Sequence, residues 1–531
     1  MLKTNLMKKI FLFLAFALLF LSACLIGAQQ TESTPDASPT FAPNASAPTP
    51  KQIRPTLHWE TSNPKTPTAT ATPTWKLPAF SAADRSIYLN GLAPEYQSAA
   101  ENGLPSASLY SIDFIIADEL YRLAGSETVI YTNAENVELN EINFRLYPNL
   151  LGGEMRVSKI SIDKKSVVPT YSLNDSLLTL PLKIALQPQE SVVVSMDFTA
   201  TISQTVDFNH GVQSYYDATL SLAHAYPVIA VYDAKGWNAE IPSRFGDVLY
   251  ADASFFVVTV DAPKRITLVA SGYEAQREEI GNRQKVAYIA GPARDFYLAA
   301  SSEYQVFTKD ANGIALRFYA RASVQVGAEY ALNVAARALA IFSEKYAPYP
   351  YRELDFVATS TTAGGMEYPG AIAVAKEYLS ASDFYLESVV AHEVGHQWFY
   401  NLVGNNQLSE PWLDESLTQF AALQYFDVQG QALFRRDMEN RWNAIDRRGI
   451  PVGLPVNAYS HAEYSGIIYG RGGLFFEALR DSMSVKNFDA FFKDYVQSSL
   501  WGIATTEKLK TTAETHCACD LTPLFAQWIY P

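Results

Sequence analysis

The sequence is poor in cysteine, histidine and positive charge. Its 531 residues include three cysteines and seven histidines, and the excess of acidic over basic side chains gives a formal net charge of −14. Three cysteines in so long a chain exclude a fold that depends on a network of disulfides. The acidic balance excludes a protein whose main task is to bind nucleic acid, because such proteins present a basic face to the phosphate backbone.

The N-terminus has the features of a secretory signal. Three lysines, Lys3, Lys8 and Lys9, precede an unbroken apolar run over residues 10–21. This run is shorter than the roughly 20 apolar residues that span a bilayer, and its length is typical of the apolar region of a signal peptide. The sequence therefore predicts a protein that leaves the cytoplasm.

The four residues LSAC, at positions 21–24, resemble a bacterial lipobox. In such lipoproteins the signal peptide is removed before the cysteine, which then carries the lipid. The resemblance implies that residues 1–23 are a lipoprotein signal peptide and that Cys24 is lipidated. The protein would then be extracytoplasmic and anchored to a membrane of the cell envelope. An uncleaved anchor that continues through residues 25–28 is the alternative, and it leads to the same location.

Composition divides the remainder of the chain into three segments. Residues 24–80 are expected to form a linker, because they hold ten of the 28 prolines among many Thr, Ala and Ser residues and cannot bury a core. Residues 81–310 are expected to form an N-terminal all-β domain, since runs such as SVVVSMDF, SFFVVTVDAP and KVAYIAG are short, β-branched and bounded by turn residues. Residues 311–531 form the second domain, with a helix-period stretch at 326–346 and a mainly helical pattern from Tyr385 onward.

Two cysteines near the C-terminus, Cys517 and Cys519, admit three roles. A structural zinc site needs four ligands, and His516 is the one other ligand type beside them. A disulfide between residues two apart would be strained. We therefore expect both cysteines to be packing residues.

The pattern that carries most chemistry is HEVGH at residues 392–396. Its histidines, His392 and His396, are four residues apart, so a helix would place both imidazoles on one face, within reach of one ion. Glu393 lies between them, where it could accept a proton from an activated water without binding the metal. A solvated helix with a surface histidine pair is the alternative. The residues expected to bury the opposite side of the helix are Val390, Val394, Trp398 and Leu402.

A catalytic zinc site needs a third protein ligand and an open fourth position. Glu415 follows His396 after 18 intervening residues, and Pro411 just ahead of it is a helix-start signal. This separation suits a helix end, a loop and an antiparallel return. Asp414 is the competing ligand.

These motifs together resemble those of the zinc aminopeptidases of the aminopeptidase N and leukotriene hydrolase type, within the gluzincins. That family carries His-Glu-x-x-His, eighteen residues and a glutamate within Trp-Leu-x-Glu, here WLDE ending at Glu415. Its Gly-x-Met-Glu-Asn motif corresponds to GGMEYPG at residues 364–370, and its tyrosine ahead of a basic residue and glycine corresponds to Tyr469 in IIYGRGG. The resemblance covers residues 110–528.

The resemblance implies a fold, a cofactor and a reaction. The fold would be an N-terminal all-β domain followed by a mainly α, thermolysin-like α+β zinc-peptidase domain. One Zn²⁺ per chain would be held by His392, His396 and Glu415. With Glu393 as the general base, the protein would remove N-terminal amino acids from peptide substrates by attack of activated water on the first peptide bond.

The resemblance also assigns the remaining site residues. Tyr469 would donate a hydrogen bond to the oxyanion, with Tyr464 as the rival donor. Glu367 would capture the free α-amino group, and the glycines would let a peptide pair with the backbone as an added strand. The residues expected to bind substrate are Gly364, Gly365, Met366 and Glu367.

Two departures from the family pattern concern how a substrate is held. Tyr368 stands where many members have Asn, and larger members continue into a helical C-terminal domain that narrows the entrance. The alternative functions are a zinc endopeptidase on the same scaffold and an inactive peptide-binding lipoprotein. Glu367 argues against the first, and Glu393 against the second, because binding alone needs no base. The sequence does not specify an oligomeric state.

Overall fold

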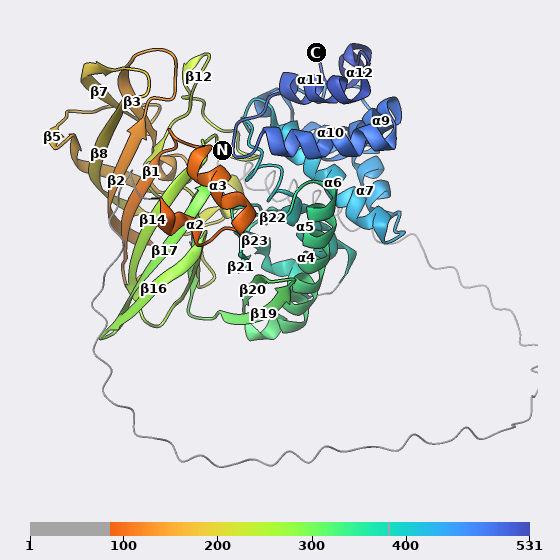
Figure 1. Ribbon diagram of the computed structural model, residues 1–531. Helices are drawn as coiled ribbons and strands as arrows, with labels where there is room; N and C mark the ends of the chain where they lie inside the picture. The colour runs from red at the N-terminus through yellow and green to blue at the C-terminus, as the bar shows by residue number, and fades with distance from the viewer. Residues whose placement is uncertain (1–84, 381–382) are drawn as a thin grey trace, which may run out of the picture. The chain divides into compact units, whose positions relative to one another are not determined.

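The computed structural model describes residues 85–380 and 383–531 (Figure 1). The signal peptide expected at residues 1–23, the lipidation expected at Cys24 and the linker expected at residues 24–80 lie outside the described residues. Within the described part of the chain, no helix is both long enough and apolar enough to cross a bilayer.

Strands dominate the first half of the described chain, as expected. The largest sheet has eight strands in the order β16-β17-β14-β1-β2-β8-β4-β5. Every second residue of β8 is buried, because side chains on a strand alternate between the two faces of a sheet. The strands are β1 (Leu109–Ile116), β2 (Arg122–Thr132), β4 (Glu154–Ile162), β5 (Lys165–Ser166), β8 (Ser191–Thr201), β14 (Ser254–Pro263), β16 (Tyr273–Ile280) and β17 (Arg283–Ala293).

Smaller sheets complete this β region. Phe144, Val194 and Leu298, which come from three different sheets, belong to one apolar core. One sheet has the order β15-β18-β10-β9, another has the order β11-β3-β7-β6, and β12 pairs with β13. Their strands are β3 (Leu139–Arg145), β6 (Thr170–Ser172), β7 (Leu177–Leu186), β9 (Gln213–Tyr216), β10 (Thr219–Leu222), β11 (Val228–Ile229), β12 (Tyr232–Asp233), β13 (Gly236–Trp237), β15 (Thr267–Ala270) and β18 (Leu298–Ser301).

A five-stranded sheet of order β19-β20-β21-β23-β22 opens the second half. The sequence places the domain boundary between residues 310 and 311, and this position is wrong by several residues. β19 pairs along its whole length with β20, so the hairpin belongs to the second sheet. Strand content alone could not show which sheet a strand joins. The strands are β19 (Gln305–Ala311), β20 (Ile314–Ala320), β21 (Glu353–Thr359), β22 (Gly365–Met366) and β23 (Ala371–Ala375).

Helices make up most of the remainder, which confirms the expected fold class of a β-rich N-terminal region followed by a mainly helical one. The helix expected at residues 326–346 is α4 (Gln325–Lys345). The apolar core of this half includes the fully buried Trp398 and Trp412. The other helices are α5 (Phe384–Gly395), α6 (Glu415–Val428), α7 (Leu433–Asn443), α8 (His461–Gly466), α9 (Gly473–Met483), α10 (Val485–Ser498), α11 (Thr506–Cys517) and α12 (Thr522–Trp528).

Two short helices, α2 (Ser86–Leu89) and α3 (Pro94–Asn102), precede β1 and were not expected within an all-β domain. α3 packs with the helical half, where the Tyr96 hydroxyl donates to the Pro348 carbonyl at 2.7 Å. Leu92 also forms an isolated bridge with Tyr351. Helices of four and nine residues carry too little periodic pattern to be recognised in a sequence.

Cys517 and Cys519 are bonded to each other, so the expectation that they only pack is wrong. α11 ends at Cys517, and Ala518 adopts the left-handed conformation. That turn brings the two Cα atoms to 5.1 Å, within the range that a disulfide spans. The sequence argument took the short separation as the obstacle and did not foresee the reversal of the chain.

Candidate active site

The HEVGH residues begin on α5 and end just beyond it. The Asp383 side chain caps the helix by accepting hydrogen bonds from the backbone N–H groups of Tyr385 and Leu386. The helix ends at Gly395, and His396 is its C-cap residue. The four apolar side chains expected on the far side are all fully buried, although two of them follow the end of the helix: Val390, Val394, Trp398 and Leu402.

The two histidine rings converge on one point. Nε2 of His392 and Nε2 of His396 are 3.0 Å apart. Nδ1 of His396 lies 2.9 Å from the carbonyl oxygen of Phe399, which can only accept, so Nδ1 carries the proton. Nε2 of His396 is therefore left with a lone pair, which is the state that a metal ligand needs.

Glu415 completes the triad from the first position of α6. Its Oε2 lies 3.2 Å from Nε2 of His392 and 3.5 Å from Nε2 of His396. Burial works to raise the pKa of Glu415, but the two neighbouring imidazoles, His392 first, hold it well below its usual value, so the carboxylate is ionised. Asp414, the competing ligand, instead caps α6 by accepting from the Glu415 backbone N–H.

The donor set fits a catalytic zinc ion. Two imidazole nitrogens and one carboxylate oxygen lie within 3.0 to 3.5 Å of one another, and a single ion about 2 Å from each can occupy the space between them. Two histidines and a glutamate are the ligands of one established class of catalytic zinc site. The ligands predicted from the sequence are thus brought together.

Glu393 points into the site without joining the triad. Its carboxylate is buried, and Oε2 has no hydrogen-bond partner among the described residues. Burial raises the pKa of Glu393 well above its usual range, with His396 opposing the shift. A carboxyl group whose pKa is raised toward neutrality can both accept and return a proton.

One of the two predicted glycines, Gly365, lies directly against this base, and Gly364 lies against Val389. A Cβ atom at Gly365 would stand 2.5 Å from Oε1 of Glu393, and one at Gly364 would stand 2.9 Å from Val389. Gly365 and Met366 form β22, the last strand of the five-stranded sheet, which pairs with β23 on one side only. Its outer edge is therefore open to a peptide added as a further strand.

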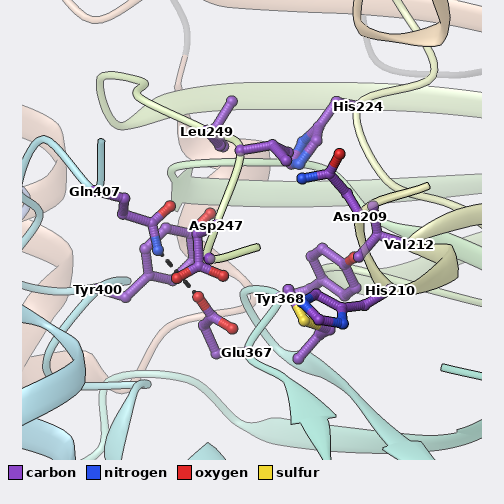
Figure 2. Close-up of a pocket in the computed structure, with 13 residues that line it drawn as sticks. Asn209, His210, Val212, His224, Asp247, Leu249, Glu367, Tyr368, Tyr400 and Gln407 are labelled. Carbon is purple, nitrogen blue, oxygen red and sulfur yellow. Dashed lines mark hydrogen bonds between the residues drawn. The ribbon is translucent and has the colours of Figure 1, made fainter. Parts of the chain in front are cut away.

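Three buried carboxylates gather beside the metal ligands, and the sequence identified only one of them as a substrate-binding residue. One oxygen each of Asp247, Glu367 and Asp414 lie within 4.8 Å of one another. The Gln407 amide donates to both Glu367 (3.0 Å) and Asp414 (2.8 Å). Figure 2 shows Asp247, Glu367 and Gln407 facing each other.

Asp247 is the residue of this group that sequence reasoning missed. It stands between β13 and β14, is 8% exposed, and its Oδ2 has no partner among the described residues. Burial, followed by the charges of Glu367 and Glu415, raises the pKa of Asp247 well above its usual value. A bound cation would relieve this repulsion. No motif marks the position, because only folding brings the loop to the site.

Tyr368, the departure from the family pattern, turns away from the metal. Its ring stacks on Tyr297 of the β region with centroids 4.0 Å apart. It lines a small side cavity of about 20 Å³ beyond Glu367, together with Asp247 and Tyr400 (Figure 2). The side chain therefore closes the wall behind Glu367 and contributes no polar atom to the triad.

Tyr469 approaches the metal ligands from the opposite side. It stands in a π-helical turn between α8 and α9, and its hydroxyl donates to Oε1 of Glu415 at 2.5 Å. The rival Tyr464 packs 5.8 Å from the Tyr469 ring, and its hydroxyl has no partner among the described residues. Of the two tyrosines, Tyr469 is the one in contact with the triad.

Most of these groups line one cleft of about 360 Å³. The walls come from the β region and from the helical half, so the cleft is lined by residues far apart in the sequence. Its lining includes the triad, Glu393, the β22 edge and both tyrosines. The arrangement can activate a water molecule, hold a cation beside the metal and donate a hydrogen bond to a developing negative charge.

Comparisons with known proteins agree with this geometry. Residues 330–528 match the Peptidase family M1 domain. Aminopeptidase M1 of Arabidopsis thaliana is 24% identical over 51% of this chain and 33% of its own length. Endoplasmic reticulum aminopeptidase 2 of Homo sapiens is 23% identical over 77% of this chain and 44% of its own length. The chain thus spans a third to less than half of these curated relatives.

A solved structure shares the fold over more of the chain. An M1 zinc metallopeptidase from Deinococcus radiodurans superposes with a TM-score of 0.63 at 18% identity, covering 80% of this chain and 93% of its own. The superposition therefore supports the fold, a β-rich region followed by a mainly helical one.

Proposed function

We propose that this chain, which carries a peptidase family M1 domain of the aminopeptidase N type, is a zinc-dependent aminopeptidase that removes single residues from the N-termini of peptides. The observation that carries the proposal is the buried carboxylate of Glu367 beside the metal triad. One oxygen of Glu367 lies within 4.8 Å of a nitrogen of His396. A cation site at that distance from the metal places the first peptide bond of a substrate at the reactive centre.

Zn²⁺, when bound, polarises the scissile carbonyl and lowers the pKa of water toward about 7. Glu393 takes the proton from the attacking water and returns it to the leaving amine. Its raised pKa and its free Oε2 suit both transfers. Gly365 lets the substrate backbone come close to this carboxylate, since no side chain stands between them.

Tyr469 supports the negative charge that develops on the carbonyl oxygen. Burial, followed by the charge of Glu415, raises the pKa of Tyr469 well above its usual value, so the phenol keeps its proton. The hydroxyl that donates to Glu415 can turn to the oxyanion as it forms. A hydrogen bond that forms only as the charge develops stabilises the transition state more than the ground state.

Glu367 and Asp247 hold the α-ammonium group of the substrate. Both carboxylates are buried, and a bound cation turns their mutual repulsion into attraction. A charge-assisted hydrogen bond of this kind is stronger than a neutral one. It also fixes the distance between amine and scissile bond, which distinguishes an aminopeptidase from an endopeptidase.

The decisive experiment uses a panel of aminoacyl reporter amides with the full chain, in the presence and absence of a chelator. We expect hydrolysis that is lost with the chelator and restored by Zn²⁺. We also expect the same amides with an acetylated amino group to be poor substrates. Equal cleavage of blocked and free substrates would identify an endopeptidase, and no cleavage of any substrate by the zinc-loaded protein would identify an inactive binding protein.

We further propose that the protein is a lipoprotein of the cell envelope, anchored through Cys24. The support is the LSAC sequence after a short apolar run with a basic start. Cys24→Ser should abolish lipid attachment, because only a thiol accepts the lipid there. Detergent partitioning and the mass of the mature N-terminus measure this directly, and a wild-type protein cut elsewhere would rule out the lipobox.

A further inference from the structure

The cleft carries one strongly basic group, which lies away from Glu367 and Asp247 and is paired with Asp437 of the same helix. Among the described residues that line it, Arg441 is the only arginine or lysine. It stands in the last turn of α7, with its side chain 41% exposed. A guanidinium that lines the substrate cleft and is partly exposed can bind an acidic group of a ligand in addition to its Asp437 partner.

The order of groups along the cleft can be read from neighbouring contacts. Glu367 and Glu393 lie next to His396. On the other side, the His392 ring is 6.0 Å from the Tyr469 ring, and the Arg441 guanidinium lies 5.9 Å from the centroid of that same ring. The cleft therefore runs from a pair of carboxylates, past the metal ligands, to a guanidinium beyond Tyr469.

The guanidinium is fixed but not saturated. Nε of Arg441 donates to Asp437 at 2.8 Å, and Nη1 approaches the Ser465 hydroxyl at 3.4 Å. An arginine side chain has five N–H groups in a planar fork, so these two contacts leave donors for a ligand. A carboxylate is the group whose geometry matches such a fork.

From this layout, and on the basis of the aminopeptidase function proposed above, we infer that Arg441 binds the C-terminal carboxylate of short peptides, which are the preferred substrates. The α-ammonium group lies at Glu367, the first peptide bond lies at the metal ligands, and the rest of the peptide passes Tyr469. An extended chain advances roughly 3.3–3.6 Å per residue, so about two to three further residues reach the guanidinium. The cleft thus fits zwitterionic peptides of roughly three to four residues.

The test compares a tripeptide with its C-terminal amide, as a ratio of kcat/KM measured with the zinc-loaded full chain. In the wild type we expect the free acid to be favoured roughly tenfold, the usual worth of a hydrogen bond to a charged group. Arg441→Gln should bring this ratio close to one, and Arg441→Lys should give an intermediate ratio. For a hexapeptide pair the wild-type ratio should be close to one, because its carboxylate lies past Arg441.

A matched control comes from the same helix. Arg436 is exposed and lies outside the cleft, so Arg436→Gln removes one positive charge from α7 and should leave the ratio at its wild-type value. A wild-type ratio near one, or a full preference retained in Arg441→Gln, would overturn the inference. Aminoacyl reporter amides separate this result from a failure of the proposed function, since they have no carboxylate and report aminopeptidase activity alone. If Arg441→Gln does not fold, the free-acid preference of the wild type and its change in Arg441→Lys still test the inference.

Discussion

The hydroxyl of Tyr469 donates a hydrogen bond of 2.5 Å to the metal-ligand carboxylate of Glu415. This bond holds the phenol at the edge of the triad, where the carbonyl oxygen of a substrate would develop its charge. Tyr469→Phe removes the donor and keeps the ring. We expect kcat to fall about 10²- to 10³-fold, the usual cost of losing one oxyanion donor, with zinc content unchanged.

Tyr464→Phe is the matched control for this prediction. Its ring packs beside Tyr469, but its hydroxyl has no hydrogen-bond partner among the described residues. We expect Tyr464→Phe to lose less than tenfold in kcat. Steady-state kinetics on one reporter amide compare the two variants, and a larger loss at Tyr464 would reassign the oxyanion donor.

The general base gives a second prediction. Glu393→Gln keeps the shape of the side chain and removes the proton acceptor, so turnover should fall about 10²- to 10⁴-fold. Because Glu393 lies outside the triad, the variant should retain one zinc ion per chain and a wild-type melting temperature in the zinc-loaded state. Comparable turnover in variant and parent, at equal zinc content, would contradict the role of Glu393.

The third prediction separates the ligand Glu415 from its neighbour Asp414. Zinc binds the folded state, so adding the metal to the chelated wild-type protein should raise its melting temperature. Glu415→Ala should abolish both the bound zinc and this shift. Asp414→Asn should retain them, because Asp414 contacts the Glu415 backbone and Gln407. Metal analysis and thermal unfolding give the readouts, and full zinc occupancy in Glu415→Ala would make Asp414 the ligand.

The metal triad was predictable because two of its ligands are set by local geometry. The spacing of His392 and His396 fixes their common direction within one helical turn, and the Glu415 position follows from a helix start that Pro411 marks. The core side of α5 was predictable for the same reason. The spacing of apolar residues within a short segment predicts which side of a helix is buried, and this prediction does not depend on the remainder of the fold.

Asp247 was not predictable, because its role depends on tertiary contact alone. It stands in a loop of the β region and meets Glu367 only after the two halves of the cleft have formed. The Cys517–Cys519 bond was not predicted because it depends on the left-handed conformation of Ala518, which the sequence does not indicate. β19 was placed in the first domain because strand pattern gives no sheet membership. Each failure concerns partners that the local sequence does not encode.

The last prediction concerns Glu367 and decides between an aminopeptidase and an endopeptidase. The α-amino group of a peptide is largely protonated near neutral pH, and two buried carboxylates lie beside the metal ligands to receive it. Glu367→Ala should therefore reduce kcat/KM for free-amine substrates roughly 10- to 100-fold, as expected for a lost hydrogen bond to a charged group. Acetylating the substrate should cause a similar loss in the wild type. The two losses should not add, since both remove one interaction.

Asp247→Asn keeps the shape of the side chain and removes its charge. It should reduce kcat/KM for free-amine substrates less than Glu367→Ala does, and it should cause no further loss when the substrate is acetylated. Additive losses, or a wild type that cleaves acetylated peptides internally as fast as free ones, would show that Glu367 does not hold the amine and that the enzyme is an endopeptidase.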